Sequence, residues 1–239
     1  MFALFGVLSV ALFGVVLSVR FALSRREAAR DLAAQRLVQR SLRLYLRVGS
    51  ALRVFSVETH DVERLGQRPQ LVLANHPTLL DVVVLLAHMP QADCVAKGAA
   101  WNNPFLRAVV SAAAYIPNDS AEQLITACCE RLAAGRSVVL FPEGSRSPAH
   151  GLRPFRRGAA HIALASGCPV VPVLLHCDPP ALKKDRPWYA LPNETLRFRL
   201  EVDPPLRTLT ADLGELPRSL AARRVTERLR EHFERRLSQ

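Results

Sequence analysis

A histidine and an aspartate five residues apart are the pair in this sequence best suited to catalysis. They are His76 and Asp81, in the stretch of residues 71–81 with the sequence LVLANHPTLLD. A carboxylate beside a histidine fixes its tautomer and leaves the second ring nitrogen to take a proton. We therefore interpret His76 as a general base for acyl transfer to a hydroxyl and Asp81 as the group that orients it. The alternative is a histidine that only caps a helix.

The hydrophobic pattern predicts the elements that position this pair. Residues 71–74 form an apolar run typical of a buried strand. Pro77 favours the start of a helix, predicted for residues 78–88. Residues five apart on a regular helix do not face each other. The two side chains meet only if His76 precedes the first helical turn and the chain curls back.

A second polar segment follows another apolar strand, predicted at residues 138–141. Residues 141–147 have the sequence FPEGSRS and contain Glu143, Gly144, Ser145 and Arg146. Ligands of open α/β sheets bind at the carboxyl ends of strands, so we expect both segments at one edge. Glycine permits close backbone approach, so the Gly144 N–H is a candidate donor to an oxyanion. Arg146 offers a planar guanidinium suited to phosphate, with a solvated ion pair as the alternative.

These segments together resemble the glycerolipid acyltransferase family, of the lysophosphatidate acyltransferase type. His76 and Asp81 match its NH-x4-D motif, and FPEGSRS resembles its FPEG-x-RS block. Residues 171–173, VPV, resemble a further block, and residues 97–104 are similar to a weaker one with lysine and proline. The resemblance covers roughly residues 55–206. It implies that Glu143, Gly144 and Arg146 bind the acyl acceptor.

The full set of predicted substrate-binding residues is Glu143, Gly144, Ser145, Arg146, Lys97 and Arg153. Arg153, Arg156 and Arg157 form a cluster for which phosphate binding and a merely solvated face are both open, and Lys97 has the same two interpretations. No metal or cofactor motif is present, so neither is expected.

The chain departs from the family pattern in two places. Leu106 and Arg107 stand where the family usually has a glycine, and Asn118 stands where it usually has an arginine. An arginine there is expected to help hold the phosphate of lysophosphatidate. We therefore hypothesise that lysophosphatidate is not the preferred acceptor.

The predicted function is a membrane-bound O-acyltransferase that moves a fatty acyl group from acyl-CoA or acyl carrier protein to a lysophospholipid hydroxyl. The substrate hydroxyl would itself be the nucleophile, so no covalent enzyme intermediate is needed. The alternatives are a non-catalytic lipid-binding membrane protein, an acyl thioesterase, and an acyltransferase for a specialised non-glycerolipid acceptor.

Composition limits the partners. The 239 residues carry a net charge of +11, which favours a polyanionic partner such as an anionic membrane surface. Aromatic residues are only 6%, and no zinc-finger or RNA-recognition motif is present, so nucleic acid is not expected. The five cysteines lack C-x-x-C spacing, which fits a reducing compartment.

The N-terminal segments predict a membrane location. Residues 1–23 are almost uncharged and long enough for a membrane helix, with a secretory signal as the alternative. Arg20, near the end of this segment, and Arg25, Arg26 and Arg30, which follow it, place the remaining chain in the cytoplasm. Residues 24–54 predict a basic amphipathic helix that either lies in the interface of the cytoplasmic membrane or packs on the domain with a solvated arginine face.

Residues 55–239 are the predicted catalytic domain. Strands and helices alternate there, which predicts an α/β fold with a mostly parallel sheet flanked by helices. Strands are expected near residues 54–57, 71–74, 94–96, 115–116, 138–141, 170–175 and 195–202, the last edge-like. Helices are expected at residues 78–88, 105–113, 120–134, 157–166 and 216–237.

Overall fold

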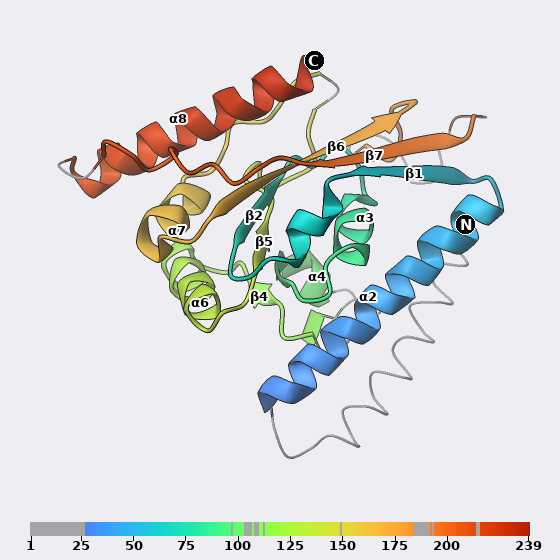
Figure 1. Ribbon diagram of the computed structural model, residues 1–239, viewed down its shortest axis with the longest axis horizontal. Coiled ribbons are helices and arrows are strands. Elements are labelled where there is room, and N and C mark those ends of the chain that lie inside the picture. The colour runs from blue at the N-terminus through green and yellow to red at the C-terminus, as the bar shows by residue number, and fades with distance from the viewer. Residues whose placement is uncertain are drawn as a thin grey trace.

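One sheet forms the centre of the molecule (Figure 1). The computed structural model describes residues 27–96, 98–102, 107, 110–111, 113–148, 150–183, 192, 194–213 and 216–239. Within these ranges, seven strands lie in the order β1-β7-β6-β2-β5-β3-β4. They are β1 (Phe55–His60), β2 (Leu71–Ala74), β3 (Asp93–Ala96), β4 (Ile116–Pro117), β5 (Val138–Leu140), β6 (Val170–Asp178) and β7 (Leu196–Val202).

The sheet is mostly parallel, as predicted. Strand β2 pairs in parallel with β5 on one side and β6 on the other. Among the described strands only β6 and β7 pair antiparallel. The edge-like assignment of β7 was wrong. Its alternating burial is as predicted, but β1 pairs along its outer side, so β7 is an inner strand.

Helices cover both faces of the sheet, and each face has its own apolar core (Figure 1). On one face lie α2 (Glu27–Ala51) and α3 (Asp81–Ala87), with the short α4 (Gly98–Asn102) nearby. On the other lie α6 (Ala121–Ala133), α7 (Gly158–Ser166) and α8 (Arg218–Leu237). A 3-10 helix, η1 (Val62–Gly66), joins β1 to β2. The sheet therefore has both faces covered, as parallel sheets require.

The helix predicted within residues 24–54 is α2, and it packs on the domain. Its Val38 and Tyr45 are buried, and Gln35 donates hydrogen bonds to Asp93 and to the Ala113 carbonyl oxygen, both at 2.9 Å. The opposite face exposes the predicted arginines: Arg36, Arg40, Arg43 and Arg47. Contact of that face with lipid stays a prediction.

The predicted membrane helix, residues 1–23, lies outside the described residues. Among the helices that are described, none combines the length and the apolar character that crossing a bilayer requires. The helix predicted for residues 105–113 also falls largely outside the described part of the chain.

Most other helix ends follow the sequence signals. Ser120 caps α6 by accepting a hydrogen bond from the Gln123 N–H, and Gly167 ends α7 in the left-handed conformation. The predicted start of α3 at residue 78 was wrong, because the first residue of the helix is Asp81. The backbone N–H and hydroxyl of Thr78 both bond to the Asp81 carboxylate, which holds residues 78–80 in a turn before the helix.

A buried ion pair fixes the end of the sheet opposite the carboxyl edge. Arg136, before β5, donates two hydrogen bonds to the fully buried Asp93 of β3, at 2.5 and 2.6 Å. Gln91 lies 3.3 Å from the same carboxylate. Since Gln35 of α2 also bonds to Asp93, this network joins α2 to two strands.

We predict that Arg136→Ala lowers the free energy of unfolding by about 3–5 kcal/mol, because it leaves the Asp93 charge buried without its partner. Urea titration monitored by circular dichroism measures the change. The matched control is Arg223→Ala, which breaks an exposed pair with Glu227 on α8 and should cost less than about 1 kcal/mol. Equal losses in the two variants would contradict the prediction.

Candidate functional site

Three loops meet where β6, β2 and β5 end. The strands are neighbours in that order, so the segments after Ala74, Leu140 and Asp178 leave the sheet side by side. Contacts between the segments confirm this: the Ser147 N–H donates to the His76 carbonyl oxygen at 2.7 Å, and the Leu79 N–H donates to that of Leu182 at 3.2 Å. The two polar segments that the sequence predicted at one edge of the sheet therefore lie together in a single site.

The histidine–aspartate pair is formed as predicted. His76 Nδ1 lies 2.8 Å from Asp81 Oδ2. The side chain of His76 is 18% exposed and that of Asp81 is 1% exposed, so the histidine reaches the surface and the aspartate does not. With Nδ1–H donating to the carboxylate, Nε2 carries the lone pair. The imidazole also stacks on Phe141, with ring centroids 4.5 Å apart.

The Asp81 carboxylate has further donors. Oδ2 also accepts from the Thr78 N–H at 2.6 Å, and Oδ1 accepts from the Thr78 hydroxyl at 2.6 Å. Complete burial raises the pKa of Asp81, and the contacts with His76 and Thr78 oppose that rise. The ion pair with a protonated His76 is thus the arrangement that favours the carboxylate form.

Asn75 and Thr78 are residues that the sequence reasoning passed over. The Asn75 side chain donates to the Leu175 carbonyl oxygen at 2.9 Å and accepts from the Leu175 N–H at 2.7 Å. It therefore ties the β2 loop to β6 directly before His76. The signal for Thr78 was its position three residues before Asp81, where short polar side chains commonly bond locally.

Glu143 is buried at 4% exposure and lies under the loops. Its Oε1 accepts from the His76 N–H at 3.1 Å and from the Ser147 hydroxyl at 2.6 Å. Its Oε2 accepts from the Arg153 N–H at 2.8 Å. These bonds place Glu143 in contact with the loop that carries His76 (residues 75–80), and its predicted role in acceptor binding stays a prediction.

Gly144 adopts a left-handed conformation with φ of 63°. A Cβ atom at this position would lie 2.6 Å from Nε of Arg156, so the arginine passes directly over the glycine. The prediction that the Gly144 N–H donates to an oxyanion was wrong. It donates to the Phe141 carbonyl oxygen at 2.9 Å and closes a turn, so it does not face an oxyanion.

The remaining predicted binding residues surround this turn. Arg146 is half-buried and donates to the Leu182 carbonyl oxygen at 2.8 Å, which occupies one of its five N–H groups. Arg153 Nε donates to the Arg146 carbonyl oxygen at 2.7 Å. Ser145 lies in the turn and is partly exposed. Lys97 lies outside the described residues. Within the described part of the chain, no cluster of His, Cys, Asp or Glu is arranged to hold a metal ion.

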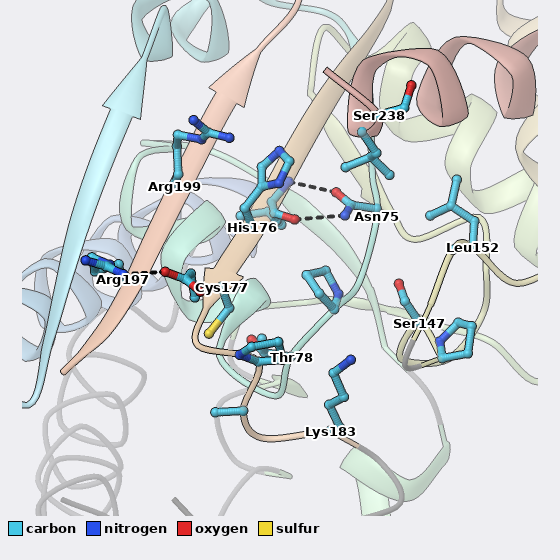
Figure 2. A pocket seen from close by; sticks show the side chains of 18 of the residues that line it. Asn75, Thr78, Ser147, Leu152, His176, Cys177, Lys183, Arg197, Arg199 and Ser238 are labelled. Carbon is cyan, nitrogen blue, oxygen red and sulfur yellow. Dashed lines mark hydrogen bonds and ion pairs between the residues drawn. The ribbon is translucent and has the colours of Figure 1, made fainter. Parts of the chain in front are cut away.

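A cavity of about 690 Å³ adjoins these loops (Figure 2). Asn75 and Thr78, which flank His76, form part of its wall, together with Ser147 and Leu152 from the segment after β5. Its charged lining is mixed, because Lys183, Arg197 and Arg199 are accompanied by Glu58, Asp178 and Glu234. Arg197 forms an ion pair with Asp178. The volume of the cavity is typical of a site for a small ligand.

The chain matches the Acyltransferase family model over residues 56–176, about half of its length. The match contains the histidine–aspartate pair, Glu143, Arg146 and Arg153, and it ends at His176 on the cavity wall.

The relatives that the chain resembles in sequence are 1-acyl-sn-glycerol-3-phosphate acyltransferases. The chain is 30% identical over 131 residues to the 1-acyl-sn-glycerol-3-phosphate acyltransferase of Helicobacter pylori, covering 51% of this chain and 55% of the relative. It is 33% identical over 112 residues to the chloroplastic 1-acyl-sn-glycerol-3-phosphate acyltransferase BAT2 of Brassica napus, covering 45% of this chain and 33% of that one. The matched segments thus span about a third to just over half of these relatives.

The fold also has a counterpart of known structure. The crystal structure of the 1-acyl-sn-glycerophosphate acyltransferase PlsC from Thermotoga maritima superposes with a TM-score of 0.61. The superposition covers 97% of this chain and 98% of PlsC at 19% sequence identity. The two chains therefore share one fold.

We predict that Gly144→Ala destabilises the protein and impairs the site. The left-handed conformation alone costs a residue with a side chain about 1–2 kcal/mol, and the new methyl group also displaces Arg156. Gly151→Ala is the matched control, because Gly151 has φ of 70° and open space around it. Thermal unfolding should show the larger loss for Gly144→Ala. Identical losses would show that the contact with Arg156 has no energetic consequence.

Proposed function

The chain belongs to the acyltransferase family, and we propose that it transfers a fatty acyl group from a thioester donor to a hydroxyl of a lysophospholipid. The donor would be acyl-CoA or acyl carrier protein. The observation that carries the proposal is the 2.8 Å contact between His76 Nδ1 and the buried Asp81 carboxylate, with Nε2 on a partly exposed ring. This is the arrangement that activates a hydroxyl nucleophile.

The proposed reaction uses His76 twice. Its Nε2 removes the proton from the acceptor hydroxyl while that oxygen attacks the thioester carbonyl carbon. The tetrahedral intermediate then collapses, the carbon–sulfur bond breaks, and the proton held by His76 passes to the leaving thiolate. Asp81 stabilises the imidazolium between the two steps and stays ionised. The products are the acylated lipid and the free thiol of the donor.

Two arginines of the second loop support binding of a phosphate. Arg146 is anchored through Leu182, and its planar guanidinium is suited to a phosphate oxygen pair. The Arg153 side chain donates to the Arg146 carbonyl oxygen, so it is held beside the Arg146 backbone. We propose that Arg146, assisted by Arg153, holds the phosphate of the acceptor.

The cavity beside the β2 loop is the space that we propose for a polar part of one substrate. Asn75 and Thr78, from the loop that carries His76, belong to the cavity wall. Lys183, Arg197 and Arg199 also line the cavity (Figure 2). A polar group bound there would lie directly beside Asn75 and Thr78, which hold the loop of His76 in place.

We propose that the enzyme works at the cytoplasmic membrane, with its catalytic domain on the cytoplasmic side. Helix α2 exposes Arg36, Arg40 and Arg47 together with Leu44, which is 52% exposed. Basic and apolar side chains on one helix face fit an anionic lipid surface.

The proposed acyl transfer is tested by assaying the protein with a panel of labelled acyl donors and acceptors and identifying the products by mass spectrometry. Acyl-CoA and acyl carrier protein are each offered with lysophosphatidate, lysophospholipids with larger headgroups, non-glycerolipid hydroxyl compounds and no acceptor. Acyl release without an acceptor would indicate a thioesterase, and no turnover with any pair would favour a lipid-binding protein. Running Asn118→Arg beside the wild type tests whether Asn118, at the end of β4, weakens the use of lysophosphatidate.

We predict that His76→Ala and Asp81→Asn each lower kcat by roughly 10²- to 10⁴-fold, the range of general base catalysis. The first removes the base, and the second removes the carboxylate that fixes its tautomer. Steady-state kinetics with the best substrate pair measures kcat, and circular dichroism checks the fold. A folded His76→Ala variant that keeps most of its activity would show that another group is the base.

We predict that Leu152→Trp, which narrows the cavity, raises KM for one substrate and leaves kcat nearly unchanged. The larger side chain fills space in a cavity whose lining includes neither His76 nor Asp81. The control is Leu220→Trp on the exposed face near the start of α8, whereas only the C-terminal end of that helix lines the cavity. Unchanged KM values for both substrates would exclude the cavity from substrate binding.

A further inference from the structure

The backbone of His76 is held on both sides by the segment that follows β5. Its N–H donates to Glu143 Oε1 at 3.1 Å, and its carbonyl oxygen accepts from the Ser147 N–H at 2.7 Å. The peptide groups that flank the histidine are therefore fixed by residues 67 and 71 positions later in the chain. The imidazole is fixed separately, by Asp81 and by stacking on Phe141.

The Glu143 carboxylate points into the protein rather than toward open solvent. The residue is 4% exposed, and both oxygens accept hydrogen bonds: Oε1 from His76 and Ser147, Oε2 from Arg153. A carboxylate that accepts from three donors in a buried setting has little capacity left for a substrate hydroxyl or phosphate. The negative charge of the Glu143 carboxylate would also repel a phosphate.

We propose that Glu143 is a positioning residue, which sets the place of the His76 backbone and does not bind the acceptor. The proposal rests on the proposed acyl transfer and differs from the acceptor-binding role that the family resemblance implies for this residue. Glu143 acts through a chain of contacts: its carboxylate locates the His76 peptide, and the peptide locates Nε2 relative to the acceptor hydroxyl.

The consequence is kinetic. General base catalysis requires Nε2 within hydrogen-bonding distance of the hydroxyl, and an error of about 1 Å in such geometry costs roughly 100-fold in rate. Loss of a positioning contact therefore lowers kcat, whereas loss of an acceptor contact raises the KM of the acceptor. The two roles of Glu143 predict different kinetic changes.

The test compares Glu143→Ala and Glu143→Gln with Arg146→Ala in the full chain. Glutamine keeps a carbonyl oxygen for His76 and Ser147 but turns its amide toward the Arg153 N–H, so it preserves the shape and part of the network. We expect kcat to fall by roughly 100-fold in Glu143→Ala and less in Glu143→Gln, with the acceptor KM nearly constant. Arg146→Ala should instead raise the acceptor KM.

A second measurement needs no turnover. Diethyl pyrocarbonate modifies exposed histidine nitrogens, and mass spectrometry resolves the rate at each of the seven histidines. We expect the rate at His76 to change in Glu143→Ala and, more weakly, in Ser147→Ala, which removes the 2.6 Å bond to Oε1. The rate at His60, a surface histidine with a side chain 51% exposed, should stay constant.

The outcomes separate the possibilities. A fall in kcat together with an altered modification rate at His76 supports the positioning role. A rise in acceptor KM with unchanged kcat, or an unchanged rate at His76 in folded variants, overturns it. If the wild type transfers no acyl group to any acceptor, the proposed function fails, and the modification rates still decide whether Glu143 positions His76. Glu143→Gln and Ser147→Ala keep the test available if Glu143→Ala does not fold.

Discussion

The buried carboxylate of Asp81 is the constraint on which the conformation of the loop that carries His76 depends. A carboxylate taken out of water must be hydrogen-bonded, and here the donors are the Thr78 N–H, the Thr78 hydroxyl and the ring of His76. Satisfying these bonds curls residues 76–80 back over the first residue of α3. The loop therefore has its shape because of the carboxylate, and the orientation of the imidazole follows from that shape.

The order of strands extends this local constraint to the whole sheet. Strand β2 has parallel neighbours on both sides, so the loop that carries His76 leaves the sheet between the loops of β5 and β6. Asn75 fastens it to β6 through Leu175, and Glu143 fastens it to the segment after β5. The loop of His76 is thus held from two sides by hydrogen bonds between side chains and backbone, which suits the proposed role of His76 as a base, because the position of such a group affects the rate.

The sequence predicted what depends on local patterns. Alternating apolar runs and caps such as Ser120 gave the α/β order, and the spacing of His76 and Asp81 required the histidine to precede the helix. Features decided by contacts far apart in the chain were missed. Strand β7 becomes an inner strand when β1 pairs with it, and Glu143 points inward to residues of another loop. No periodicity in the sequence carries this information.

The position of Asp81 also carries an energetic conflict. The proposed mechanism requires the carboxylate form, while complete burial raises the pKa of Asp81 and so favours the neutral acid. Because the folded-state pKa lies above the unfolded one, ionised Asp81 costs folding free energy at neutral pH, and the cost disappears as pH falls below the unfolded value. The hydrogen bonds from His76 and Thr78 oppose this cost, and the start of α3 places the charge where the helix dipole favours it. Thr78 is therefore more than a connecting residue: it supplies two of the three hydrogen bonds that keep the partner of the base ionised in a buried site.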